Sequence, residues 1–335
     1  MTPLHSSPEN QALRSRRFDV TLVGDTNLDI LLYGLPETMP PEQELLADGL
    51  AIHLGGSGAI TAHNLAALGS SAGFVTPLRS DDFGNLCQTE LQRAGVDLSH
   101  SVPIQSAPTG VTVHLQHQTV RHMLTYAGAT FHLTFKDLDL NYLANARHFH
   151  MPSYYLQRAL TPDIPKLFSI LKQAGLTISL DPNDDPTQVW DRGILEALRM
   201  VDVLMPNERE ACLLAAEPGL ESAIGVLREL VPLLIIKRGA DGVSAYRGAV
   251  SWHVPARPVE VVDAVGAGDS FNAGFLHGFV RGWSIDKALA HGNHTAAWST
   301  TASGGTTAFR EQDAMRGFYL AWEEDIAAGQ RPPSR

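Results

Sequence analysis

The stretch from residue 263 to residue 274, DAVGAGDSFNAG, carries the strongest structural and chemical signal in this chain. The β-branched segment at 259–262 predicts a strand before it, and residues 267–281 predict a long helix after it. Gly266-Ala267-Gly268 permits a tight turn at the N-terminus of that helix, where the first N–H groups have no partner within the helix. Together with the positive end of the helix dipole, these N–H groups predict an anion-binding site.

Two carboxylates flank this turn. Asp269 lies in the first turn of the predicted helix, and Asp263 lies on the strand side. Asp269 alone is equally consistent with a structural helix cap. The pair favours a catalytic site, in which Asp269 takes a proton from a hydroxyl while the turn binds a transferred phosphoryl group. Other glycine motifs are excluded, because a dinucleotide fingerprint would need glycine at Phe271 and the Gly-Lys dipeptide of a P-loop does not occur.

The pattern along the rest of the chain predicts the fold. From residue 147 onward, strands and helices alternate, and they include a predicted helix at 190–200. This alternation predicts a mostly parallel sheet with helices on both faces, a three-layer α/β sandwich. Residues 109–126 instead alternate apolar and polar side chains, which is typical of a half-exposed antiparallel hairpin. We expect the segments near 30–54 and 109–126 to form a small β-sheet that projects as a lid.

Composition excludes several classes of function. The 335 residues include 25 Lys and Arg against 36 Asp and Glu, a net charge of −11 that disfavours nucleic-acid or membrane binding. Cys87 and Cys212 form no CxxC motif, and two free thiols suit a reducing, cytoplasmic compartment. No apolar run is long enough to span a membrane, and the polar residues 1–17 do not resemble a secretory signal. We expect residues 1–17 and 327–335 to be disordered.

The segment at 263–269 resembles D-T-x-G-A-G-D, the signature of the ribokinase/pfkB family of carbohydrate kinases, with Ala264 in place of threonine. The resemblance covers about residues 18–310 and implies a ribokinase-like kinase domain over residues 18–326. It implies that Asp269 is the catalytic base and that the Gly266–Gly268 backbone is the anion hole. The implied reaction is phosphorylation of a hydroxyl of a small sugar or sugar acid, with ATP and Mg²⁺ as cofactors.

The resemblance also assigns the acceptor side of the site. Asn27 and Asp29 match an N-x-D pair that binds sugar hydroxyls, although a polar turn after the first strand is the alternative. Gly55 and Gly56 match a second glycine signature, which lets the substrate approach the backbone, although a plain helix start is the alternative. Many members have an asparagine four residues after the second glycine, where this chain has Ile60.

On the nucleotide side, the resemblance implies contacts from several short elements. The implied nucleotide-binding residues are Asn207, Lys237, Gly239, Gly242, Gly268 and Asn293. Glu210 would order a water molecule on Mg²⁺, although a helix cap with a first-turn acid explains Asn207 and Glu210 equally well. Asp263 and the loop at 303–306 match the place where many members bind K⁺. The family often has D-x-N-x-R at 181–185, where this chain has Asp185 in place of arginine.

Two other functions are compatible with the same residues. The first is a nucleoside kinase with the same fold. An aromatic lid residue that stacks on the nucleobase, such as Tyr126, would favour this alternative. The second is a non-catalytic, sugar-sensing member of the family. The intact Asp269 and glycine turn argue against the second, because a non-catalytic protein has no need of the base. The sequence does not set the oligomeric state, but family members often dimerise through the lid sheet, so the resemblance makes a homodimer through the lid one compatible assembly.

Overall fold

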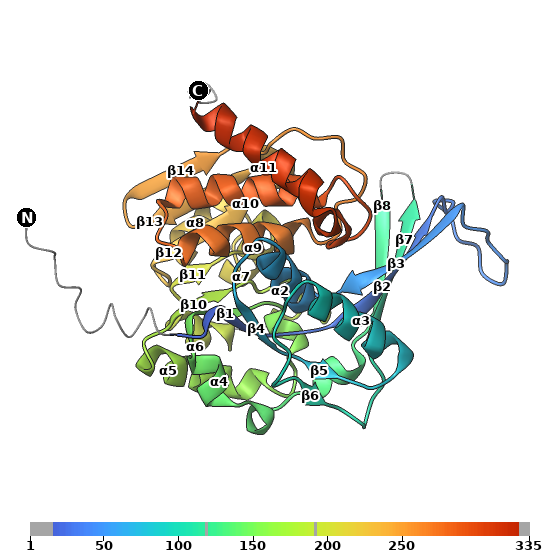
Figure 1. Ribbon diagram of the computed structural model, residues 1–335, viewed down its shortest axis with the longest axis horizontal. Helices are drawn as coiled ribbons and strands as arrows, with labels where there is room; N and C mark the ends of the chain where they lie inside the picture. Colours follow the sequence, from blue (N-terminus) through green and yellow to red (C-terminus); the bar gives the residue numbers. More distant parts are fainter. Residues whose placement is uncertain (1–15, 118–119, 191–192, 328–335) are drawn as a thin grey trace, which may run out of the picture.

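An eight-stranded sheet forms the middle layer of the protein in the computed structural model, which describes residues 16–117, 120–190 and 193–327 (Figure 1). The strand order is β14-β13-β12-β11-β10-β9-β1-β4. Strand β13 is antiparallel to both of its neighbours, and the other pairs are parallel. The strands are β1 (Phe18–Val23), β4 (Ala72–Val75), β9 (Ala146–Met151), β10 (Thr177–Leu180), β11 (Val203–Leu204), β12 (Leu233–Lys237), β13 (Val243–Arg247) and β14 (Val250–Val254).

Helices cover both faces of this sheet. Because successive side chains of a strand point to opposite faces, Leu234 and Ile236 of β12 enter one hydrophobic core, and Leu233 and Ile235 enter the other. The first face is covered by α4 (Leu140–Ala144), α5 (Ile164–Gln173), α6 (Ile194–Leu198), α7 (Glu208–Ala215) and α8 (Leu220–Leu227). The second face is covered by α2 (Ser57–Ala67), α3 (Asp82–Arg93), α9 (Ala267–Phe279) and α10 (Ile285–Ser299), with α11 (Gln312–Ala327) packed against α10 (Figure 1). The predicted three-layer α/β sandwich is therefore confirmed.

A second sheet of four strands projects from the main body (Figure 1). Its order is β3-β2-β7-β8, and its strands are β2 (Asn27–Tyr33), β3 (Gly49–Gly55), β7 (Gly110–His117) and β8 (Val120–Tyr126). These strands come from the segments predicted near 30–54 and 109–126, and we call this sheet the lid. Strand β2 begins earlier than the sequence indicates, so Asn27 and Asp29 lie in a strand rather than in a polar turn.

Short elements complete the fold. A separate parallel pair joins β5 (Pro77–Leu78) to β6 (Val102–Pro103). Single 3₁₀ turns connect several of the longer elements. They are η1 (Gly128–His132), η2 (Phe135–Asp137), η3 (Tyr154–Leu156), η4 (Thr161–Asp163), η5 (Gly239–Asp241) and η6 (Thr307–Arg310).

Two predicted elements differ in the structure. The segment at 259–262 forms no strand: Val261 and Val262 are exposed, and the Val262 amide donates to the carbonyl of Thr300 at the end of α10. Its β-branched residues therefore form an irregular connection that contacts the C-terminal end of α10. The helix predicted at 190–200 is confined to α6, because Trp190 has a left-handed backbone with a φ of 52° and cannot begin a right-handed helix.

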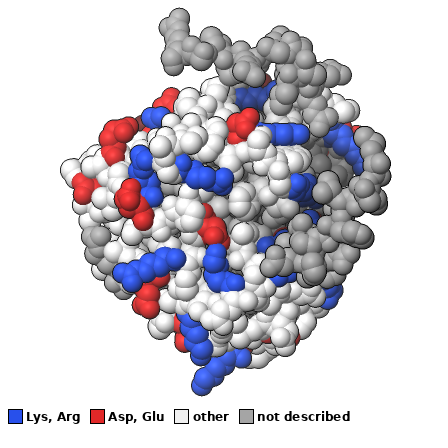
Figure 2. Space-filling view, turned by 90° about the vertical axis from the view of Figure 1, so that its left-hand side faces the viewer, with Lys and Arg blue, Asp and Glu red and all other residues white. Residues whose placement is uncertain are grey.

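The predicted disordered segments, residues 1–17 and 327–335, lie outside the described residues except for Arg16, Arg17 and Ala327. Arg16, which falls within the predicted disordered segment, donates hydrogen bonds to the carbonyls of Ala146 and Ala174. In the described ranges, no helix combines the length and the apolar character that crossing a membrane requires. Figure 2 shows basic and acidic side chains interspersed over the face that it draws.

Candidate active site

The residues around Asp269 follow the carboxyl ends of four parallel strands of the main sheet. Asp25 follows β1, Ser153 follows β9, Asp181 follows β10, and Lys237 ends β12. Asp269 faces them from the first turn of α9. Since the carboxyl ends of parallel strands lie at one edge of a sheet, ligands of open α/β sheets bind at this edge.

The turn before α9 has a backbone conformation that favours glycine. Gly266 is the N-cap residue with a φ of 73°, a left-handed conformation that favours glycine. A Cβ atom at this position would lie only 2.7 Å from the Cα atom of Gly305. The amide of Ala267 donates to a carbonyl within the turn at 3.3 Å. In the part of the chain that the structure describes, the amides of Gly266, Gly268 and Asp269 have no hydrogen-bond partner.

Asp269 is a buried carboxylate whose pKa is raised by its surroundings. Its Oδ1 atom accepts a hydrogen bond from Ser57 Oγ at the start of α2, and its backbone carbonyl accepts from Thr61 Oγ1 at 3.4 Å. Burial and the nearby charge of Asp181 raise the pKa of Asp269 to about 7, while Ser57 and Lys237 act in the opposite direction. A carboxyl group with a pKa near 7 can take up a proton at neutral pH, as a general base must.

Lys237 supplies a positive charge next to the turn. Its Nζ atom donates to Oδ2 of the fully buried Asp181 at 2.5 Å, and the side-chain amide of Asn272 donates to the same oxygen at 2.5 Å. A Cβ atom on Gly268 would lie 3.5 Å from this Nζ atom. Burial alone would lower the pKa of Lys237, but Asp181 and Glu210 raise it above its usual value, so the ammonium stays charged.

Glu210 and Asn207 form a capping box at the start of α7. The carboxylate of Glu210 accepts from the Asn207 amide at 2.9 Å, and the Asn207 side chain accepts from the Glu210 amide at 2.9 Å. Burial and the charge of Asp181 raise the pKa of Glu210 to about 7. Across the described ranges, no group of three or more metal-ligating side chains occurs. A single buried carboxylate such as Glu210 can contact a Mg²⁺ ion through one of the waters that Mg²⁺ usually keeps.

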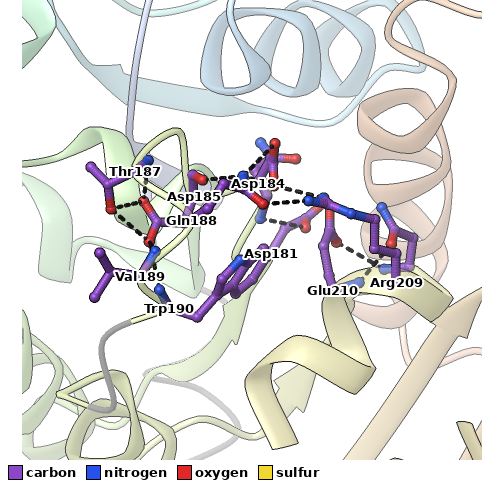
Figure 3. A network of polar contacts seen from close by, with 11 residues as sticks. Asp181, Asp184, Asp185, Thr187, Gln188, Val189, Trp190, Arg209 and Glu210 are labelled. Carbon is purple, nitrogen blue, oxygen red and sulfur yellow. Dashed lines mark hydrogen bonds and ion pairs between the residues drawn. The ribbon is translucent and has the colours of Figure 1, made fainter. Parts of the chain in front are cut away.

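The loop at 182–190 is organised by a carboxylate (Figure 3). Asp185 accepts hydrogen bonds from the amides of Thr187, Val189 and Trp190 at 2.9, 3.0 and 2.7 Å. Burial alone would raise the pKa of Asp185, but these hydrogen bonds lower it below its usual value. Arg209 of α7 donates to Asp184 at 2.7 Å and fixes the loop from the other side. Asp185 stands where the family often has arginine. Its carboxylate stabilises the conformation of the loop by accepting these amide hydrogen bonds.

The predicted acceptor residues lie at the base of the lid. The carboxylate of Asp29 lies directly over Gly55, where a Cβ atom would collide with it. Nε2 of His114, on the neighbouring strand β7, is 3.5 Å from Asp29 Oδ2. Asn27 is buried, and within the described ranges its Oδ1 atom has no hydrogen-bond partner. Gly56 is the N-cap residue of α2, immediately before Ser57.

The remaining nucleotide-side residues gather near the end of β14. The carbonyl of Gly242 accepts from the Arg238 amide at 2.9 Å and closes the turn that contains η5. Gly239, in the same turn, faces open space. Asn293 of α10 donates to the carbonyls of Val254 and Pro255 at 2.9 and 3.0 Å, so its amide hydrogens hold α10 against β14.

Asp263 ties the glycine turn to the loop at 303–306. Its two carboxylate oxygens accept from the amides of Val265 and Gly304 at 3.0 and 2.9 Å. The lid reaches the same loop, because Tyr33 and His53 both hydrogen-bond the Ser303 hydroxyl, at 2.5 and 2.8 Å. The structure thus gives Asp263 a clamping function at the predicted K⁺ position.

Comparison with known proteins gives matches along most of the chain. The family model described as pfkB family carbohydrate kinase matches residues 17–312. The chain belongs to this family. A ribokinase from Haemophilus influenzae is 26% identical over 297 residues, which cover 86% of this chain and 94% of that protein. A fructokinase from Klebsiella pneumoniae is 31% identical over 295 residues, which cover 82% of this chain and 95% of that protein.

Solved structures agree with this assignment. A putative ribokinase II from E. coli, in complex with ATP and Mg²⁺, is similar with a TM-score of 0.79 and 25% sequence identity, covering 91% of this chain and 99% of that chain. As a member of the pfkB family, the protein is a phosphotransferase with an alcohol group as acceptor. The fold and family expected from the glycine turn are thereby confirmed.

One position sets this pfkB kinase apart from the pattern of its family. Ile60 is 3% exposed, and Cβ atoms built on Gly266 and Gly305 would lie 3.1 and 2.9 Å from its Cδ1 atom. Ile60 therefore packs beneath the glycine turn. At the position where the family pattern predicts an asparagine, this chain thus has an apolar contact to the glycine turn.

Two polar residues of the site, Ser57 and Asp25, were not predicted from the sequence. Ser57 Oγ donates to Asp269 and accepts from the side-chain amide of Asn183, and Asp25 accepts from the Ser57 and Gly58 amides at 3.1 Å each. Ser57 directly follows the predicted glycine pair, and Asp25 follows strand β1 at the edge of the sheet where ligands bind. Both places in the sequence could have marked these residues as part of the site.

Proposed function

We propose that the protein transfers the γ-phosphoryl group of ATP to a hydroxyl of a small sugar or sugar acid. The observation that carries this proposal is the position of Asp269, with a pKa of about 7, beside the unpartnered amides of the α9 turn in the described structure. Lys237 adds a positive charge at the same place. A base next to an anion site is what phosphoryl transfer to a hydroxyl requires.

In the proposed reaction, the acceptor hydroxyl gives its proton to Asp269 as its oxygen attacks the γ-phosphorus atom. The new oxygen–phosphorus bond forms, the bond from the γ-phosphorus to the bridging oxygen breaks, and ADP leaves. The amides of Gly266 and Gly268 and the ammonium of Lys237 stabilise the charge on the transferred group. Positioning of the two substrates supplies much of the rate. Asn27 and the neighbouring Asp29 would bind the other acceptor hydroxyls.

The nucleotide and its cations would lie on the opposite side of the turn. Asn207, Gly239, Gly242 and Asn293 would border the nucleotide. Glu210 would hold a water of Mg²⁺, which neutralises charge on the ATP phosphates when it is bound. K⁺ would bind at carbonyl oxygens of the loop at 303–306, next to the clamp that Asp263 forms.

An ADP-release assay over pentoses, hexoses, keto-deoxy sugar acids and nucleosides tests the proposed function. We expect release that depends on MgATP and on one sugar or sugar acid, and that is slower when K⁺ is replaced by Na⁺. A preference for a nucleoside would replace the proposed acceptor class with the nucleoside alternative. If no acceptor in the panel supports ADP release, the proposal is contradicted. Identical rates with and without K⁺ would contradict the proposed K⁺ site.

We also propose that the protein forms a homodimer through the lid. The strand register places apolar residues on one face of the lid: Leu28, Ile30, Leu32, Leu50, Ile52, Leu54, Val111, Val113, Leu115, Leu124 and Tyr126. Leu50, Ile52, Leu124 and Tyr126 are each at least half exposed, at 63%, 50%, 59% and 56%. Monomeric proteins rarely expose an apolar face of this kind, and a second copy of the lid would bury it.

The double substitution Leu50→Lys and Ile52→Lys is expected to convert the dimer to a monomer, because it places two charges in the proposed interface. Both side chains are already half exposed within one chain, so the fold should survive. Sedimentation velocity at micromolar concentration measures the change. Leu320→Lys, at an equally exposed position on α11, is the matched control and should stay dimeric. A monomeric wild-type protein would end this proposal.

We place the protein in the cytoplasm. The basis is that Cys87 and Cys212 are both free thiols in the structure, which suits a reducing compartment. Fractionation of the cells that express the protein tests this placement, and recovery outside the cytoplasm would contradict it.

A further inference from the structure

Asn183 connects two carboxylates of the site, those of Asp25 and Asp269, through two serine hydroxyls. The side-chain amide of Asn183 donates to Ser57 Oγ at 2.5 Å and to Ser153 Oγ at 3.0 Å. Ser57 Oγ donates in turn to Oδ1 of Asp269. The Ser153 hydroxyl lies close to the buried carboxylate of Asp25 and lowers its pKa, against the raising effect of burial. Each serine therefore lies between the amide and one carboxylate.

The direction of these hydrogen bonds is fixed by the amide. The NH₂ group of an asparagine can only donate, and it has two hydrogens, both of which are used here. Each serine oxygen accepts one of them, so the hydrogen of each hydroxyl is available for the carboxylate on the other side. The backbone of Asn183 is itself left-handed, with a φ of 53°, a conformation that a functional site can hold at some cost in strain.

Only one oxygen of Asp269 is occupied by this arrangement. Ser57 contacts Oδ1, and no donor among the described residues reaches Oδ2. A carboxylate that takes a proton from an acceptor needs one free oxygen and a fixed orientation. The contact to Ser57 provides the orientation and leaves Oδ2 free.

We propose that Ser57 is a positioning residue that holds the base Asp269 through Oδ1 and that Asn183 fixes the direction of the Ser57 hydroxyl. This inference rests on the proposed function, because it assigns a partner to the same base. Its consequence is kinetic: the hydroxyl favours the ionised carboxylate, which is the form that accepts a proton.

The other charged groups around Asp269 act on its ionisation independently of Ser57. Asp181 and Asp25 face it from the ends of β10 and β1 and raise its pKa, and Lys237 faces it from β12 and lowers it. These groups stay in place when Ser57 is replaced. A change in the titration of Asp269 in a Ser57 variant therefore reports the hydroxyl alone.

The pH dependence of kcat/KM for the acceptor tests this proposal, since it reports the ionisation of essential groups in the free enzyme. In Ser57→Ala, we expect the acid limb of the profile to move upward by about one pH unit, because a hydrogen bond to a charged group is lost. At pH 7 the rate should fall about five-fold, and at pH 9 most of it should return. Ser57→Thr keeps the hydroxyl and should keep the wild-type limb.

Ser153→Ala is the matched control, because it removes the other hydroxyl on Asn183 without touching Asp269. Its acid limb should coincide with that of the wild type. Asn183→Gly, which tolerates the left-handed backbone, should shift the limb upward by less than Ser57→Ala does. If Ser57→Ala fails to fold, Ser57→Gly takes its place with the same expected shift.

An unchanged acid limb in folded Ser57→Ala, or an equal shift in Ser153→Ala, would overturn the positioning function of Ser57. Either result leaves the proposed base intact as long as Asp269→Asn is inactive. An active Asp269→Asn variant would instead overturn the proposed function itself. The two failures are therefore distinguishable.

Discussion

Asp269→Asn is expected to lower kcat by about 10²- to 10⁴-fold while binding MgATP with nearly wild-type affinity. The substitution keeps the shape of the side chain but removes the group that accepts the proton. The amides of the α9 turn and the ammonium of Lys237, which face the phosphates in the proposed complex, are unchanged. Calorimetric titration with MgATP and a steady-state assay on the preferred acceptor measure the two effects separately.

The same variant should fold well, and its stability should depend on pH in a defined direction. Burial raises the pKa of Asp269 to about 7, so the carboxyl costs the folded protein stability progressively as the pH rises from about 4 to 7, and fully above that. Asp269→Asn should therefore match or exceed the wild-type Tm at pH 8 and lose most of this advantage at pH 5. Asp286→Asn, at the exposed first-turn acid of the neighbouring helix α10, is the matched control and should keep full activity. Turnover close to wild type in Asp269→Asn would show that another group is the base.

The protein is expected to unfold between pH 6.5 and about pH 4.5 because it buries several neutral histidines. Burial lowers the pKa of His150, His277 and His294 to about 3 and that of His291 to about 4. The pKa of His148 is also well below its usual value, again because of burial. The unfolded chain takes up protons at these positions below pH 6.5, so stability present above that pH is lost as the pH falls.

The size of this effect is large relative to ordinary protein stability. At pH 5, each such histidine costs roughly 2 kcal/mol. Together they approach the total stability of a typical protein, about 5–15 kcal/mol. Urea unfolding followed by circular dichroism from pH 7.5 to pH 4.5 measures the loss.

A substitution identifies the source of the acid sensitivity. His294 stacks between Phe318 and Trp322, at ring distances of 4.1 and 5.1 Å, so His294→Phe should fit the site and reduce the pH dependence. His132→Phe, on the surface, is the control and should leave it unchanged. A urea midpoint that stays constant from pH 7.5 to pH 5 would contradict the prediction.

The fold and the family could be predicted because their signals are local. The glycine turn at 266–268 needs only neighbouring residues to be recognised, and the alternation of strands and helices follows the chain. Local patterns also gave wrong predictions. The β-branched residues at 259–262 resemble a strand, but they do not pair with any strand in the described structure. Trp190 resembles a helix start, but the Asp185 carboxylate holds its amide in a loop.

The contacts within the site could not be predicted because they join distant parts of the chain. Ser57 and Asp269 are 212 positions apart, and only the closing of the sheet brings them together. Asn207 and Glu210 show the opposite case. Their spacing predicts both a helix cap and a site on the nucleotide side, and the capping box in the structure leaves the Glu210 carboxylate near Asp181 and Lys237. A local motif can thus serve the helix and the proposed site together.

The central claim is phosphoryl transfer from ATP to a hydroxyl, and ³¹P NMR of the reaction mixture tests it most directly. With MgATP and the preferred acceptor, the wild-type protein should convert the γ-phosphate signal of ATP into a new phosphomonoester signal, with ADP formed in equal amount. The same mixture with Asp269→Asn should keep its ATP signals over the same time. Conversion of ATP only to inorganic phosphate, or a phosphomonoester formed equally fast by Asp269→Asn, would contradict the account.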